Sequence, residues 1–254
     1  MKKLNIILAM ALVLSGVAHA QEYRIPKNSG RLELNIGRVT VEGHNGNEII
    51  FTSKNGKFEK DERAEGLRLV NSLGLEDNTG GLGINVSVKG NVVEVHQLKQ
   101  THSPDIKILV PNGVIVSFKY ESQHGGTARF QNLTNEIEVS ALYNSIELDK
   151  VTGPLTIETT YGSVTADFTA PIKDPVSIVS IYGFVDVTIP QATKANVKLS
   201  TSYGDIFVAP ELNLQVASRD GMRVYSDKIS GTINDGGVNI DLDCNYGKIY
   251  LRKK

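Results

Sequence analysis

A Tyr-Gly dipeptide that recurs at a nearly constant interval is the feature that most constrains this fold. Tyr followed by Gly or Asn occurs at Tyr143, Tyr161, Tyr182, Tyr203 and Tyr246. The first four tyrosines are separated by 18, 21 and 21 residues, and the last follows after 43, about two further periods. A period of about 20 residues is typical of stacked architectures, in which each repeat buries its apolar face only against its neighbours.

The residues around each dipeptide alternate between apolar and polar with a period of two. In one unit, Val176, Ile178 and Ser180 precede the tyrosine on one parity, and Val185 and Val187 follow the glycine on the shifted parity. A period of two places one set of side chains on one face of a strand, and glycine gives the backbone freedom that a tight bend requires. The sequence therefore predicts an all-β fold, a β-solenoid of about 20-residue repeats in which two short strands meet at a glycine corner.

Consecutive units are expected to form consecutive rungs of this solenoid. Ile178 and Leu199 should then lie inside adjacent rungs, and Glu158 and Lys198, of opposite parity, should face solvent. Two further units are degraded, with His124 and Asp220 in the aromatic position. We interpret His124 as a repeat variant rather than a catalytic base.

The position two residues before each tyrosine is always small, being occupied by Ala141, Thr159, Ser180, Thr201 and Cys244. Cys244 is the only cysteine, so no intramolecular disulfide can form. The column that it joins is inward-facing and otherwise unreactive, which favours a packing role for a thiol that behaves as a small hydrophobe.

Two arrangements of the tyrosines are compatible with the sequence. Their parity matches that of the apolar columns, which favours an aromatic stack inside the corner of successive rungs. The alternative is an exposed ladder on which sugar rings or a partner strand lie. Val179, Ile181 and Phe184 are apolar residues at otherwise polar positions, which indicates a surface patch or a site covered by another segment. The candidate interaction surface therefore comprises Tyr143, Tyr161, Tyr182, Tyr203, Tyr246, Val179, Ile181 and Phe184.

The N-terminal segment, residues 1–20, has the features of an export signal. Lys2 and Lys3 precede an apolar stretch that ends at Ala18-His19-Ala20, a small-x-small cleavage site. We predict a signal peptide over residues 1–20 and an exported mature protein, periplasmic or at the cell surface. Nothing later in the sequence is apolar enough for a transmembrane helix, so no membrane-spanning segment is expected after cleavage.

Residues 21–112 are predicted to form an N-terminal β region that caps the repeat region, residues 113–254. Strands are expected between 31 and 53, interrupted by a turn at 45–47, and at 84–88, 92–96 and 106–110. Residues 61–72 form the one helix-like segment. No Pro/Ser-rich linker separates the two regions.

Charge and motifs exclude several functional classes. The net charge is −1 without clustered Lys and Arg, so nucleic acid is not an expected partner. No HExxH, GxSxG, P-loop or GxGxxG motif occurs, and we predict no cofactor, no metal and no catalytic residue. Asp241 and Asp243 share one face of a strand and could bind a hard cation, but neighbouring units do not repeat them, which argues against a calcium site. Glu136, Glu138 and Glu158 are the acidic candidates for an enzyme.

The order of several short segments resembles that of an exported bacterial family known as putative adhesins, a β-solenoid domain of unknown function. The resemblance covers most of residues 31–254 and depends on Val39–Gly43 with Asn45-Gly46, Ala64–Leu67, Asp77–Gly80, Ile108–Pro111 and Val151–Pro154. It implies an envelope location and adhesion, and it supplies no catalytic residues. The unit at Asp220 departs from the repeat pattern.

We therefore expect a non-enzymatic exported scaffold for adhesion or envelope interactions, with a cell-surface glycan or an envelope protein as its partner. Two alternatives remain open at this point. One is a polysaccharide-degrading β-helix enzyme, and the other is a periplasmic sensory or regulatory partner.

Overall fold

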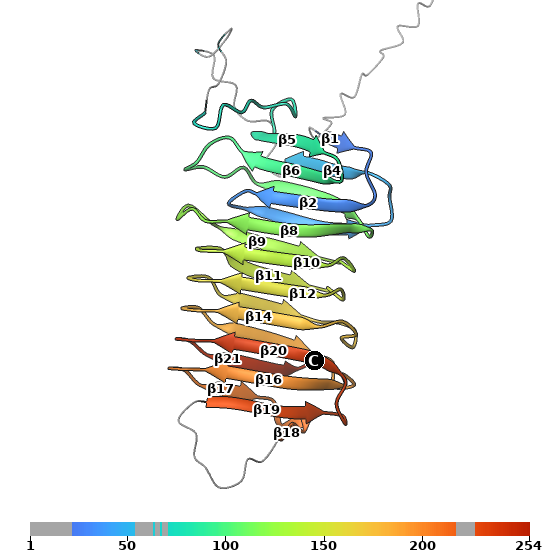
Figure 1. The fold of residues 1–254 in the computed structure, drawn as a ribbon, viewed down its shortest axis with the longest axis vertical. Helices are drawn as coiled ribbons and strands as arrows, with labels where there is room; N and C mark the ends of the chain where they lie inside the picture. The colour runs from blue at the N-terminus through green and yellow to red at the C-terminus, as the bar shows by residue number, and fades with distance from the viewer. Residues whose placement is uncertain (1–21, 54–62, 64–66, 68–70, 217–226) are drawn as a thin grey trace, which may run out of the picture.

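A computed structural model shows two β-sheets that face each other along a slender stack (Figure 1). It describes residues 22–53, 63, 67, 71–216 and 227–254. The predicted signal peptide, most of the helix-like segment 61–72 and Asp220 lie outside the described residues. Among those that are described, no helix is long and apolar enough to cross a membrane.

The two sheets contain ten and eleven strands. In spatial order, the ten-stranded sheet consists of β1 (Glu22–Ile25), β4 (Ile49–Ser53), β7 (Ile106–Pro111), β3 (Val39–His44), β9 (Thr127–Gln131), β11 (Ser145–Asp149), β13 (Val164–Asp167), β15 (Val185–Ile189), β21 (Ile249–Lys253) and β17 (Ile206–Val208). The eleven-stranded sheet consists of β18 (Gln215–Val216), β19 (Asp227–Ile233), β16 (Ala195–Thr201), β20 (Val238–Cys244), β14 (Val176–Ser180), β12 (Leu155–Thr159), β10 (Ile137–Ala141), β8 (Val114–Tyr120), β2 (Gly30–Asn35), β6 (Val92–Gln97) and β5 (Ile84–Lys89). A 3-10 turn, η2 (Pro210–Leu212), follows β17.

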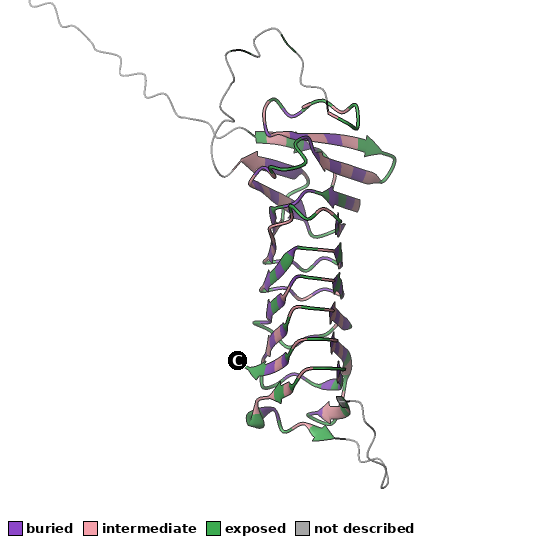
Figure 2. Cartoon of the chain, turned by 90° about the vertical axis from the view of Figure 1, so that its left-hand side faces the viewer, coloured by how far each residue is buried: buried purple, intermediate pink, exposed green. Residues whose placement is uncertain are grey.

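The repeat region confirms the predicted all-β solenoid. Each rung places one strand in each sheet, and the strands of successive rungs pair in parallel without a register shift. Ile157, Ile178 and Leu242 therefore lie in one buried column. Figure 2 shows the resulting alternation of buried and less buried positions along the strands. The period of two in the sequence is thus the inside–outside alternation of the strands.

The order of the last rungs differs from the expected one. Ile178 pairs with Leu242, and Leu242 in turn pairs with Leu199, so Ile178 and Leu199 are not in adjacent rungs. The C-terminal rung, β20 and β21, is inserted between the rung of β14 and β15 and the rung of β16 and β17 (Figure 1). The outer edge of β16 is taken by the antiparallel strand β19, so β20 pairs with the inner edge.

The N-terminal strands continue the same two sheets. β2 pairs in parallel with β8, and β3 with β9, while β1, β4 and β5 add antiparallel strands at this end. The strands predicted between residues 31 and 110 are all present, and residues 45–47 connect β3 to β4. The division near residue 112 stays a prediction.

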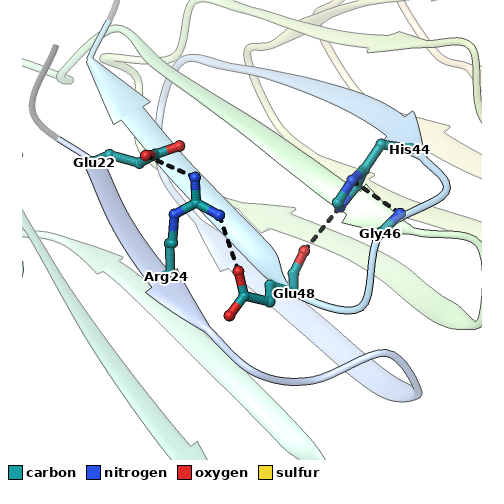
Figure 3. A network of polar contacts seen from close by, with 5 residues as sticks. All are labelled: Glu22, Arg24, His44, Gly46 and Glu48. Carbon is teal, nitrogen blue, oxygen red and sulfur yellow. Dashed lines mark hydrogen bonds and ion pairs between the residues drawn. The ribbon is translucent and has the colours of Figure 1, made fainter. Parts of the chain in front are cut away.

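Polar contacts fix the ends of β1 and β4 at this end of the stack (Figure 3). The Arg24 guanidinium donates to the carboxylates of Glu22 and Glu48, at 2.9 Å each. The Gly46 N–H donates to Nδ1 of His44, which leaves the proton on Nε2, 2.8 Å from the Glu48 carbonyl oxygen. His44 therefore stabilises the turn between β3 and β4.

A candidate interaction surface: the tyrosine ladder

The five tyrosines form one continuous stack of rings, in the spatial order Tyr143, Tyr161, Tyr182, Tyr246, Tyr203. Neighbouring ring centroids are 4.8, 5.0, 4.8 and 4.9 Å apart, and the ring planes differ by 6° to 14°. This spacing is that of adjacent strands in a sheet, so each ring follows the backbone of its own rung. We refer to these five residues as the tyrosine ladder.

The tyrosine ladder is exposed, and the prediction of an internal stack is wrong. The tyrosines retain between 43% and 74% of their accessible surface, with Tyr203 at the end of the ladder the most exposed. The alternation of inward and outward side chains did not predict the direction of the tyrosines, because it holds only within a strand. β14 ends at Ser180, two residues before Tyr182, and the chain turns the corner there. The Tyr182 N–H donates to the Thr160 carbonyl oxygen of the preceding rung, which fixes the turning backbone.

The hydroxyl residue two positions before Tyr161, Tyr182 and Tyr203 supports the corner through hydrogen bonds in both directions. The Ser180 hydroxyl donates to the Gly162 carbonyl oxygen of the preceding rung at 2.8 Å, and it accepts from the Gly183 N–H of its own rung at 3.1 Å. Thr159 makes the equivalent contacts with Asn144 and Gly162. A hydroxyl suits this buried position because it both donates and accepts.

Glycine follows four of the five tyrosines, and the close approach of successive corners requires it there. A Cβ at Gly183 would overlap the Gly162 carbonyl oxygen, and a Cβ at Gly247 would overlap that of Gly183. Asn144 replaces glycine in the first unit, where its amide donates to the carbonyl oxygens of Gly37 and Gly126 at 2.7 and 3.0 Å. Only this first corner has room for a side chain, because the preceding turn carries Gly125 and Gly126.

Cys244 occupies the same column and is fully buried. Its Sγ lies 3.3 Å from the Gly183 carbonyl oxygen, in the position of the serine or threonine hydroxyl of other rungs. Burial raises the pKa of the Cys244 thiol, so the nucleophilic thiolate is disfavoured in the folded protein.

We expect thiol reagents to modify Cys244 slowly in the native protein and rapidly after denaturation, because burial limits both access and ionisation. The measurement is the rate of labelling by a maleimide at constant pH, with and without denaturant. Equal rates in the two states, or a crosslinked dimer on a non-reducing gel, would contradict the packing role.

The tyrosine hydroxyls have no protein partner among the described residues. No hydrogen bond joins the hydroxyl of any ladder tyrosine to another described side chain or to backbone. Neighbouring rings are too widely spaced for their hydroxyls to bond to one another in register. The ladder therefore presents to its surroundings a row of ring edges and free hydroxyls, while most ring faces are covered by adjacent rings.

The structure separates the three remaining candidate residues. Ile181 and Phe184 flank Tyr182 in the same corner, and Phe184 is 42% exposed. Val179 lies on the outer face of the eleven-stranded sheet, between Glu158 and Asp243 of the neighbouring strands. Ile181 and Phe184 therefore belong to the surface of the ladder, whereas Val179 does not.

A second stacked pair of aromatic rings, not predicted from the sequence, lies outside the tyrosine ladder. The rings of Phe207 and Tyr250 lie 5.3 Å apart at 11° on the outer face of the ten-stranded sheet. Each stands three residues after a corner glycine, Gly204 or Gly247, and this shared offset could have revealed the pair. Lys248 lies over the Phe207 ring and Arg252 over the Tyr250 ring.

The acidic candidates do not converge. Glu138 forms a two-pronged ion pair with Arg31 at 2.7 and 2.9 Å, and Glu158 and Glu136 are exposed at other positions. Asp241 lies 3.8 Å from Lys198 and, with Asp243, lines a shallow groove of about 240 Å³ on the outer face of the eleven-stranded sheet. The described residues contain no group of three or more His, Cys, Asp or Glu side chains arranged to hold a metal. His124 is exposed in the turn between β8 and β9.

Comparisons with known proteins identify the family to which this chain belongs. No curated protein matches the sequence significantly. A putative cell adhesion protein from Clostridium sporogenes ATCC 15579 is similar in structure, with a TM-score of 0.45, 12% identity and coverage of 92% of this chain and 100% of that one. A putative adhesin from Bacteroides fragilis NCTC 9343 has a TM-score of 0.34 and 10% identity, with coverage of 92% and 96%. The family model described as Toastrack DUF4097 matches residues 18–252, and the chain therefore belongs to this family of β-solenoid-like domains.

Proposed function

We propose that this protein is an exported, non-enzymatic scaffold whose tyrosine ladder is its interaction surface, acting in adhesion or in contacts within the cell envelope. The observation that carries the proposal is the row of five exposed rings whose hydroxyls have no partner among the described residues. Tyrosine is enriched in binding surfaces because it supplies a rigid, amphipathic contact at low entropic cost. Export is supported by the sequence of residues 1–20.

The stack restricts the chemistry of the partner. A sugar ring that stacks on tyrosine needs a free ring face, and the inner rings have neighbours 4.8 to 5.0 Å away on both sides. The most accessible face is the outer face of Tyr203, the most exposed ring at the end of the ladder. A glycan would therefore bind through the ring edges and hydroxyls or at this end, whereas a protein surface can use the whole row.

Ladder variants should reduce binding without destroying the fold. Tyr161→Ala and Tyr182→Ala each remove two ring contacts, and a stacked aromatic pair contributes about 0.5 to 1.5 kcal/mol. We therefore expect each variant to lose about 1 to 3 kcal/mol of unfolding free energy and to bind intact cells and glycan arrays more weakly than wild type.

Glu158→Ala is the matched control, because Glu158 is exposed on the sheet face away from the ladder. Its binding should equal that of wild type. Cell fractionation of the native protein tests the envelope location in parallel. The proposal fails if the protein stays in the cytoplasm, or if both tyrosine variants bind as wild type does. Release of reducing ends from a polysaccharide would instead support an enzyme.

A further inference from the structure

The strip around the tyrosine ladder has the composition of a small self-associating surface. The ladder is flanked on one side by Leu142, Thr160, Ile181, Asn245 and Ser202, and on the other by Ser145, Ser163, Phe184, Lys248 and Asp205. We call these ten residues and the ladder the ladder strip. Its only two charged side chains are Lys248 and Asp205, which are 3.3 Å apart in an ion pair. Two such strips can therefore approach without like-charge repulsion.

Two of the three apolar flanking residues of the strip, Ile181 and Phe184, lie at its centre, and the third, Leu142, lies in the end rung. Tyr182 is the third of the five rings, and Ile181 and Phe184 flank it. The neighbouring rungs place Thr160 and Ser163 on one side, and Asn245 and Lys248 on the other. An apolar centre with a polar rim is the usual arrangement of protein–protein interfaces.

The spacing of the rings along the ladder indicates which kind of partner can match it. An extended peptide presents side chains on one face about every 6.6 Å, which falls out of step with rings spaced 4.8 to 5.0 Å apart within two rungs. A second ladder of the same chain has the identical repeat and supplies a facing hydroxyl at every rung. Each tyrosine hydroxyl can donate one hydrogen bond and accept others, so two facing rows satisfy one another.

We propose that the ladder strip pairs with the same strip of a second copy of this chain, about a two-fold axis at the Tyr182 rung. This inference rests on the proposed function of the ladder as the interaction surface and names its partner. Such an interface is isologous, because the same residues contribute from both copies. The ladder is only about 20 Å long, so the contact lies below the roughly 800 Å² per partner of a standard interface. The dimer is accordingly weak, with a Kd on the order of 100 µM.

Sedimentation equilibrium of the purified protein over a concentration series tests this pairing. Wild type should show a monomer–dimer equilibrium, and Phe184→Glu should raise the dimer Kd by at least about 10-fold, because it places a charge at the centre of the contact. Phe207→Glu is the matched control, since Phe207 is a similarly exposed ring, 48% against 42%, outside the strip. Lys248 lies over the Phe207 ring, and the rung of Lys248 is bonded to the rung of Phe184, because the Val185 N–H donates to the Lys248 carbonyl oxygen.

A wild-type protein that remains monomeric up to about 1 mM, or equal dimer Kd values for Phe184→Glu and Phe207→Glu, would overturn the pairing. If circular dichroism shows that Phe184→Glu is unfolded, Ile181→Lys replaces it with the same expected effect. Photo-oxidation with a ruthenium trisbipyridyl complex and persulfate should also give a covalent dimer bridged between ladder tyrosines. A bridge at Tyr23 or Tyr250 instead would contradict the proposed face.

These measurements use no glycan, cell or envelope component. A protein that binds cells through the ladder but does not self-associate would retain the proposed function and lose this inference. A protein that dimerises through the ladder strip and neither binds cells nor localises to the envelope would retain this inference and lose the proposed function.

Discussion

Gly247→Ala is expected to lower the free energy of unfolding by more than about 4 kcal/mol, the largest effect among the substitutions considered. The added Cβ would lie closer than 3.0 Å to the Gly183 carbonyl oxygen, a separation that Cβ atoms in folded proteins do not show. The Gly183 carbonyl oxygen would have to move, and it belongs to the backbone. It is also held by the next rung, because the Cys244 thiol lies 3.3 Å from this same oxygen. The corner would have to open between the rungs of β14 and β20.

Gly126→Ala is the matched control for this prediction. Gly126 lies in the same column of corner residues as Asn144 and Gly247. Thr127, the residue after Gly126, is paired with Ser145, the residue after Asn144. A Cβ there would first meet Nε of Arg38 at 3.1 Å, and an exposed arginine can move its side chain aside. We expect a loss below about 1 kcal/mol. Denaturant unfolding of both variants is the measurement, and comparable losses would show that corner contact does not limit the fold.

Ile178→Ala should cost about 2 to 5 kcal/mol, because it removes a fully buried side chain and leaves a cavity between rigidly paired strands. Leu199→Ala should cost a similar amount, because Leu199 is also buried, one rung beyond Leu242. The strands on both sides of Ile178 are hydrogen-bonded neighbours in fixed register, which limits collapse of the cavity.

Glu158→Ala and Lys198→Ala are the surface controls, and each should change stability by less than about 0.5 kcal/mol. Lys198 is 3.8 Å from Asp241 in an exposed ion pair, and such pairs contribute little. If Ile178→Ala were as mild as Glu158→Ala, the inward parity would be wrong for the whole repeat region.

The inside–outside alternation and the corners were predictable from sequence because both are local. A period of two reports which side chains face inward in a strand, and it identified the buried column of Ile157 and Ile178. The small residue and the glycine at fixed offsets from tyrosine marked each corner, and the same offset assigned Cys244 to the interior. These features follow from the geometry of single strands and turns, which a short stretch of sequence contains.

The rung order and the exposure of the tyrosines were decided only by tertiary structure. The equal spacing of Tyr161, Tyr182 and Tyr203 suits consecutive stacking, yet the rung of Tyr246 lies between those of Tyr182 and Tyr203. Every rung offers the same hydrogen-bonding edge in the same register, so the period of the sequence cannot distinguish a neighbour one repeat away from a neighbour several repeats away. The alternation likewise ends where the strand ends, and the direction of the tyrosine beyond it depends on how the corner backbone bonds to the preceding rung.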